Sequence, residues 1–292
     1  MDFSQILKDI KELKIQGATN VMKAGLEAIK IALKDSKNIY KDFNIYSDQI
    51  AWVRPTEPLL RNGLLFLKKN INEKTTYSEL CDLIEKYKKM VEEANKKISE
   101  IGAKRIKNNS TIMTICHSST VMNILKKAKD LGKNFRVFTC ETRPKFQGRI
   151  SAKELNDYGI EVVHIVDSAK AFFMKDVDMC IIGADAITSS GKVINKIGSL
   201  ELAVCAKEER VKFVVASTLL KYDIKTKQGF EEPIEFRDPE EVWYDAPKGI
   251  KILNPAFDIV DQIYIDYIIS EAGIINPYMV PVIALREYDW LY

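Results

Sequence analysis

The chain has 292 residues, of which 46% are hydrophobic and 29% are charged, a balance that is typical of a folded globular protein. Lys and Arg number 44 and Asp and Glu number 41, so the formal net charge is +3. Such a nearly balanced charge does not indicate binding to nucleic acid. Because the sequence contains no run of about 18 apolar residues, it predicts no membrane-spanning helix and no membrane partner.

The cysteines lie at positions 81, 116, 140, 180 and 205, form no Cys-x-x-Cys pair and are accompanied by only two histidines. This distribution argues against a structural zinc site and is typical of a protein in a reducing cytosol. The amphipathic, charged N-terminus lacks the apolar core of a signal peptide. We therefore predict a cytoplasmic protein.

The first third of the chain has the pattern of helices. Between residues 77 and 101, apolar side chains recur at every third or fourth position, which predicts a long helix with one buried face. A similar stripe predicts a helix over 21–33. A shorter helix is expected over 62–69, after a loop that contains prolines.

Beyond residue 105, short β-rich runs alternate with amphipathic segments. The expected strands cover 110–116, 135–139, 162–166, 178–182 and 212–216, and the expected helices between them cover 121–129, 152–158 and 199–206. This alternation predicts a doubly wound parallel sheet. The predicted fold class is therefore α/β, with an N-terminal helical domain over residues 1–107 and a Rossmann-like domain over residues 108–292.

Ligands of open α/β sheets bind beyond the carboxyl ends of the strands, and two of these ends carry residues suited to proton transfer. Cys116 ends the first expected strand, and Ser118 to Thr120 either cap the next helix or bind an anion. The positive helix N-terminus would lower the pKa of the Cys116 thiol, although a buried structural cysteine is the alternative. Asp185 follows the fourth strand, where it is either a turn cap or a general acid or base.

Basic residues follow the other strands. Arg143 and Lys145 lie in a loop after the second strand, Asn195 and Lys196 follow an expected hairpin, and Lys221 follows the last strand. Arg and Lys are common partners of phosphate groups, so these cations around one thiol and one carboxylate indicate a small phosphorylated ligand. The bland alternative is an ordinary charged surface. The sequence has neither a GxxxxGK[ST] nor a GxGxxG motif, which argues against nucleoside triphosphates and dinucleotides.

Five motifs, in chain order, resemble those of one superfamily: TICHSS, ETRPKFQGRISAKEL, GADAIT, VINKIG and NPAFDIV. This superfamily comprises aldose-phosphate isomerases and regulatory subunits of translation initiation factor two-B. Within it, the chain resembles the archaeal ribose-1,5-bisphosphate isomerases more than the methylthioribose-1-phosphate isomerases. The resemblance extends over nearly the whole chain and implies a helical domain, a Rossmann-like domain and a homodimer or hexamer.

The resemblance also implies a site and a reaction. Cys116 and Asp185 match the catalytic pair. The implied substrate contacts, to which the charge pattern adds Arg143, are Gln16, Gly17, Ala18, Thr19, Arg54, Ser118, Ser119, Thr120, Gln147, Asn195, Lys196 and Lys221. The implied reaction converts ribose 1,5-bisphosphate to ribulose 1,5-bisphosphate, in AMP salvage toward rubisco, without a metal or organic cofactor. The sequence leaves open whether AMP activates the protein.

Two segments depart from the isomerase pattern. The isomerases carry Arg-Gly-Ala-Gly where this chain has Gln16 to Thr19, so a cation that binds phosphate is missing. After Arg-Pro-Thr they continue with Ala-Val, whereas this chain continues with Glu57 and Pro58, and Arg61 is a candidate to replace the missing charge. The altered segment favours one alternative, a non-catalytic regulatory subunit that binds a sugar phosphate or nucleotide and a translation factor, whereas the retained Cys116 and Asp185 oppose it. A further alternative is a methylthioribose-1-phosphate isomerase, against which the loss of the Arg-Gly-Ala segment counts.

Overall fold

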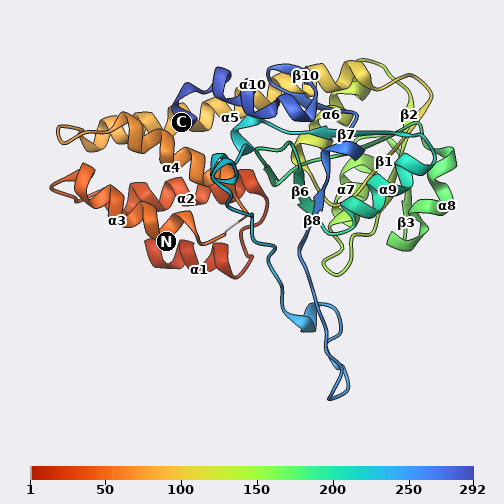
Figure 1. The fold of residues 1–292 in the computed structure, drawn as a ribbon, viewed down its shortest axis with the longest axis horizontal. Coiled ribbons are helices and arrows are strands. Elements are labelled where there is room, and N and C mark those ends of the chain that lie inside the picture. Colours follow the sequence, from red (N-terminus) through yellow and green to blue (C-terminus); the bar gives the residue numbers. More distant parts are fainter. Residues whose placement is uncertain (1, 55) are drawn as a thin grey trace.

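The N-terminal part of the chain is helical. The computed structural model describes residues 2–54 and 56–292, and its first elements are the helices α1 (Phe3–Lys11), α2 (Ala18–Leu33), α3 (Ile39–Ala51), α4 (Pro58–Asn70) and α5 (Tyr77–Arg105). Their apolar faces meet in one core, on one side of the molecule (Figure 1). The three predicted helices are confirmed, whereas α1 and α3 were not predicted. None of the described helices is long and apolar enough to span a membrane.

The longest helix, α5, joins the two parts of the molecule. It begins with a capping box, in which the Thr76 hydroxyl accepts the N–H of Glu79 and the Glu79 carboxylate accepts the N–H of Thr76 at 2.7 Å. Its first turns contribute Leu80 to the helical core, and its later turns contribute Ile98 to the core of the sheet. The predicted boundary between residues 107 and 108 falls just after this helix. That the two parts are independent domains stays a prediction.

A seven-stranded sheet with helices on both faces forms the rest of the fold. Its strand order is β10-β9-β7-β4-β1-β2-β3, and neighbouring strands are parallel except β9 and β10. The bounds are β1 (Ser110–Thr114), β2 (Phe135–Cys140), β3 (Glu161–Ile165), β4 (Met179–Ile182), β7 (Lys212–Ala216), β9 (Tyr267–Ser270) and β10 (Gly273–Ile275). The predicted α/β fold class is confirmed, and the antiparallel edge strand β10 is an addition to it.

Helices cover the sheet on both faces, as a doubly wound fold requires. One face packs against α6 (Ser119–Asp130), α7 (Gln147–Asp157) and the end of α5. The other face packs against α8 (Lys170–Phe173), α9 (Ser199–Glu208) and α10 (Val280–Glu287). Because both faces are covered, the central strands β1 and β4 are buried along their whole length.

A small antiparallel sheet lies beside the large one. Its strands are β5 (Ala186–Ile187), β6 (Val193–Lys196) and β8 (Phe257–Val260), and β5 and β6 form the predicted hairpin. Before β8 the chain makes an excursion over residues 229–255, which we call the arm. Figure 1 shows the arm projecting away from the rest of the molecule.

The order of the strands reverses at β1. The strands β2 and β3 lie on one side of it, and β4, β7 and β9 lie on the other, which is the 3-2-1-4-5-6 order of Rossmann folds. At such a switch point the loops after two adjacent strands diverge and leave a crevice at their carboxyl ends. The topology therefore places a ligand site beyond β1 and β4.

Candidate active site

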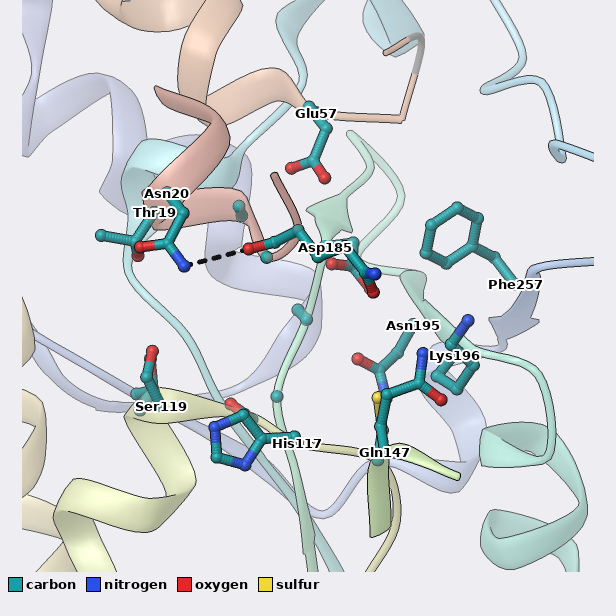
Figure 2. A pocket seen from close by; sticks show the side chains of 18 of the residues that line it. Thr19, Asn20, Glu57, His117, Ser119, Gln147, Asp185, Asn195, Lys196 and Phe257 are labelled. Atoms are coloured by element: carbon teal, nitrogen blue, oxygen red, sulfur yellow. Dashed lines mark hydrogen bonds between the residues drawn. The ribbon is translucent and has the colours of Figure 1, made fainter. Parts of the chain in front are cut away.

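A cavity of about 580 Å³ lies at this switch point, where the helical part meets the sheet. Figure 2 shows side chains from both parts pointing into it. The predicted site residues that line it are Cys116, Asp185, Gln16, Gly17, Ala18, Thr19, Arg54, Ser118, Ser119, Thr120, Gln147, Asn195, Lys196 and Lys221. The fold thus brings together residues that are far apart in the sequence.

Cys116 is held in an unusual backbone conformation just after β1. Its φ is 64°, a left-handed value that is uncommon for residues other than glycine. Its N–H donates to the Thr142 hydroxyl at 2.9 Å, and its carbonyl accepts from the Ser151 hydroxyl at 2.8 Å. The carboxylate of Asp167 in turn accepts the N–H of Thr142 at 2.9 Å. The loop after β2 and the helix α7 (Gln147–Asp157) therefore fix the position of Cys116.

The same loop carries Arg143 and Lys145, which were predicted to bind a phosphate group of the ligand. The Arg143 side chain donates to the carbonyl of Val242 at 2.9 Å, and Lys145 pairs with Glu241 at 2.9 Å. Neither Arg143 nor Lys145 lines the cavity. The prediction that they bind the ligand is therefore wrong, because their loop follows β2 and the neighbouring arm supplies their partners.

The surroundings of Cys116 favour the protonated form of its thiol. Burial raises the pKa of Cys116 to about 11, although Lys196 and the N–H of His117 act in the opposite direction. The predicted lowering of this pKa is therefore wrong, because the loss of water around the sulfur outweighs the nearby positive charge. Cys116 is only half-buried and lines the cavity, so a ligand can reach it.

Asp185 enters the cavity from the end of β4, the strand next to β1. Its N–H donates to the carbonyl of Ile194 at 2.8 Å, which ties it to the hairpin. Burial raises the pKa of Asp185, while the cations Lys221 and Lys196 lower it. Two residues earlier, Gly183 leaves no room for a side chain, since a Cβ there would lie 2.4 Å from the Ser118 Oγ.

Two helix N-termini face the cavity. Gly17, with a φ of 83°, precedes α2, and Ser118 caps α6 by accepting the N–H of Val121 at 3.4 Å. The first N–H groups of a helix have no partner within the helix and carry a partial positive charge. Residues 17–19 and 118–120 both line the cavity, so its wall is suited to phosphate groups.

The cavity wall also carries charges and unsatisfied polar atoms. Its cations are Lys14, Arg54, Lys196, Lys221 and Arg237, and its carboxyl groups are Glu57 and Asp185. In the described part of the chain, Glu57 Oε2 and Gln147 Oε1 are buried atoms of the wall that have no hydrogen-bond partner, whereas Arg54 Nε and Arg237 Nε form ion pairs with Glu235 at 3.4 and 3.3 Å. Because buried polar atoms are usually hydrogen-bonded, this clustering indicates a wall that awaits a polar ligand.

Two of these cations, Lys14 and Arg237, were not predicted from the sequence. One cation that was proposed for the site, Arg61, does not line the cavity. Arg61 lies outside the cavity and pairs with Asp223 at 3.0 Å and with Glu232 at 2.6 Å. The prediction that Arg61 replaces the missing cation is therefore wrong. Lys14 and Arg237 line the cavity instead. Arg237 belongs to the irregular arm, and its position could not be predicted because the arm has no regular hydrophobic pattern in the sequence.

The wall does not resemble a metal site. Among the residues that the structure describes, no group of three or more His, Cys, Asp or Glu side chains is placed to hold a metal ion.

Lys196 lies over the ring of Phe257, 5.4 Å from its centre, and burial lowers the pKa of this lysine. The arrangement offers a thiol and carboxyl groups for proton transfer, with cations and helix N-termini for phosphate.

Known proteins resemble this chain over almost its whole length. The model of the initiation factor 2 subunit family matches residues 14–277. A ribose 1,5-bisphosphate isomerase from Pyrococcus furiosus is 39% identical, over 99% of this chain and 94% of the relative. The crystal structure of translation initiation factor eIF-2B from Pyrococcus horikoshii has a TM-score of 0.85 at 29% identity, over 94% of this chain and 97% of that one.

A solved isomerase has the same fold. The 5-methylthioribose 1-phosphate isomerase from Pyrococcus horikoshii has a TM-score of 0.79 at 26% identity, over 98% of this chain and 88% of that one. The resemblance to this superfamily that the five sequence motifs predicted is confirmed. The chain belongs to the initiation factor 2 subunit family.

Proposed function

We propose that this protein converts ribose 1,5-bisphosphate to ribulose 1,5-bisphosphate, with Cys116 and Asp185 as the groups that transfer protons. The observation that carries the proposal is the placement of this thiol and this carboxyl group in one cavity, between two helix N-termini and among cations. An aldose–ketose isomerisation needs one group that moves a proton between carbon atoms of the sugar and a second group that exchanges protons with its oxygen atoms.

The relatives of this chain show the class of enzyme. Relatives that are 36–39% identical over most of the chain are named as isomerases of ribose 1,5-bisphosphate or of methylthioribose 1-phosphate. The prediction that the chain is a sugar-phosphate isomerase is therefore confirmed. The ribose 1,5-bisphosphate isomerases include the relatives with the higher identity, which supports that substrate.

The residues suggest how the protons move. In the reactive form, the thiolate of Cys116 takes the proton from C2 of the sugar, and it returns this proton to C1. Asp185 exchanges a proton with oxygen atoms of the sugar. Because burial raises the pKa of Cys116 to about 11, the thiolate is a minor form at neutral pH, and Lys196 stabilises it. The helix N-termini and cations hold the phosphate groups, and Arg54 contributes from the helical part.

The test is direct. Purified protein is mixed with ribose 1,5-bisphosphate, and the appearance of ribulose 1,5-bisphosphate is followed by NMR. The proposal predicts conversion by the wild type and none by Cys116→Ser, whose similar volume leaves the fold intact. Unfolding of this variant would instead assign the thiol a structural role.

One observation favours a second function. Gln16 lines the cavity where the resemblance implies an arginine, so a non-catalytic subunit that binds a sugar phosphate or nucleotide and a translation factor is the alternative. Failure to capture any initiation factor subunit in a pull-down would contradict it. The homodimer or hexamer, activation by AMP, the salvage pathway and the cytoplasmic location stay predictions.

A further inference from the structure

Glu57 is a buried carboxyl group that the cavity wall does not satisfy. Glu57 lies just before α4, is only 2% exposed to solvent and lines the cavity. In the described part of the chain, its Oε2 has no hydrogen-bond partner. Figure 2 shows its side chain entering the cavity on the side of Asp185, away from Ser119 and His117. A ligand in the cavity can therefore complete its hydrogen bonding.

The charges around Glu57 come from several elements. Arg54 lies 3.6 Å from its Oε1, but the same guanidinium lies 3.4 Å from Glu235 of the arm. Asp185 faces it from the end of β4, and Lys221 from the loop after β7. The positive charge of Arg54 is therefore shared with a second carboxylate, and Glu57 does not need to be ionised to balance it.

These surroundings favour the protonated form of Glu57. Burial and the neighbouring Asp185 raise the pKa of Glu57 to about 8, against the opposite effect of Arg54 and Lys221. The site thus holds two carboxyl groups close together, an arrangement in which one group keeps a proton while the other ionises. A protonated carboxyl group in a substrate cavity is a potential proton donor.

We propose that Glu57 is a third catalytic residue, which donates a proton to the ring oxygen of a furanose 1-phosphate while the ring opens. This inference rests on the proposed isomerase function, and it assigns the proton transfers of the site to three groups. Cys116 serves the carbon atoms, Glu57 serves the ring oxygen, and Asp185 serves the hydroxyl group on C2.

The resulting steps balance. The thiolate of Cys116 takes the proton of C2, the electron pair of that bond forms the C1–C2 double bond, and the bond from C1 to the ring oxygen breaks. The ring oxygen keeps the electron pair of the broken bond and takes the proton of Glu57. The ionised Asp185 then takes the proton of the C2 hydroxyl, C2 becomes a carbonyl, and C1 receives the proton from Cys116. Transfer of a proton from Asp185 to Glu57 restores the starting state.

This division of roles predicts a distinctive pH profile. The reactive form needs Cys116 ionised and Glu57 protonated, and kcat/KM reports the free enzyme. From pH 7 upward, kcat/KM of the wild type should rise about tenfold per pH unit and level off near pH 8, the pKa of Glu57. It should not continue to rise toward the pKa of Cys116, which is about 11.

The test compares Glu57→Gln with Glu232→Gln. Glutamine keeps the shape and a hydrogen bond but cannot give up a proton, so kcat of Glu57→Gln should fall about 100-fold with KM changed less than threefold. Its residual kcat/KM should rise through pH 8 without levelling. Glu232 is the matched control, because its pKa is also raised to about 8 but it pairs with Arg61 outside the cavity. The Glu232→Gln protein should keep the wild-type profile.

A second measurement needs no ligand. The infrared difference between wild type and Glu57→Gln at pH 7 should contain the band of a protonated carboxyl group, which disappears by pH 10. A Glu57→Gln enzyme with wild-type kcat, or one that still levels off at pH 8, would overturn the proposal, and so would a missing band. If the band is present but the wild type shows no turnover, the isomerase function fails while the protonation of Glu57 stands. Glu57→Asp, which keeps a transferable proton, should retain more activity than Glu57→Gln.

Discussion

Cys116 and Asp185 line one cavity from the ends of two adjacent parallel strands, β1 and β4. Their meeting is a consequence of topology, because the strand order reverses between these two strands and leaves a crevice there. Asp185 also contributes to the environment of Cys116, since its charge raises the pKa of the Cys116 thiol. A ligand between them would be in contact with a thiol and a carboxyl group.

Restoring a cation at position 16 should tighten binding. Gln16 lines the cavity just before the N-terminus of α2, and its side-chain amide donates to the carbonyl of Leu13 at 2.8 Å. An arginine there can bind phosphate with two charge-assisted hydrogen bonds. Gln16→Arg should lower KM for ribose 1,5-bisphosphate about tenfold, which corresponds to about 1.4 kcal/mol. An unchanged KM would show that this segment does not contact the phosphate.

Gly183→Ala should damage the site more than the fold. The added Cβ would lie 2.4 Å from the Oγ and 2.9 Å from the Cβ of Ser118, so the turn that caps α6 must move. We expect kcat/KM to fall at least about tenfold, since displacement of groups that position a substrate is costly. Steady-state kinetics and circular dichroism would check this. Unaltered kinetics would mean that Ser118 does not need its present position.

Arg61 should contribute to stability and not to binding. It forms a buried link from α4 to Asp223 and Glu232, and it does not line the cavity. Arg61→Met leaves these two carboxyl groups buried without their cation, which should lower the free energy of unfolding by about 3 kcal/mol in urea titrations. KM of the folded variant should stay within about threefold. A large rise of KM with unchanged stability would contradict this expectation and show that Arg61 contributes to ligand binding.

Most of the elements could be predicted from the sequence, because each depends on a local pattern. The apolar stripe over 77–101 and the apolar run over 110–116 are local patterns, and they appear as α5 and as β1, which ends at Thr114. The strands β8, β9 and β10 were missed because the C-terminal region mixes short apolar runs with loops. In the site, Cys116 and Asp185 stood out since each follows a buried strand.

What could not be predicted depends on tertiary structure. Arg237 reaches the cavity from the arm, and the carbonyl of Val242, which accepts from the Arg143 side chain, also lies on the arm. The pKa of Cys116 was predicted in the wrong direction, because a sequence shows the helix N-terminus but not how much water the fold removes from the thiol. Glu57 was visible as a departure from a motif, but its burial beside Asp185 was not.

The raised pKa of Glu57 has a consequence for stability. The pKa is about 8 in the folded protein against an ordinary value of 4.5, so between these values the folded state binds more protons than the unfolded state. The stabilisation from the protonated group is complete below pH 4.5 and is lost as the pH rises through 8. Between pH 6 and pH 9, the wild type should lose about 2–3 kcal/mol more stability than Glu57→Gln. Equal losses in urea titrations would contradict the raised pKa.

The most direct measurement is the NMR assay of purified protein with ribose 1,5-bisphosphate, run in parallel with the folded Cys116→Ser variant. We expect the wild type to form ribulose 1,5-bisphosphate and the variant to form none. Equal amounts of product with both proteins, or no product with either, would contradict the role of Cys116 at the centre of this site.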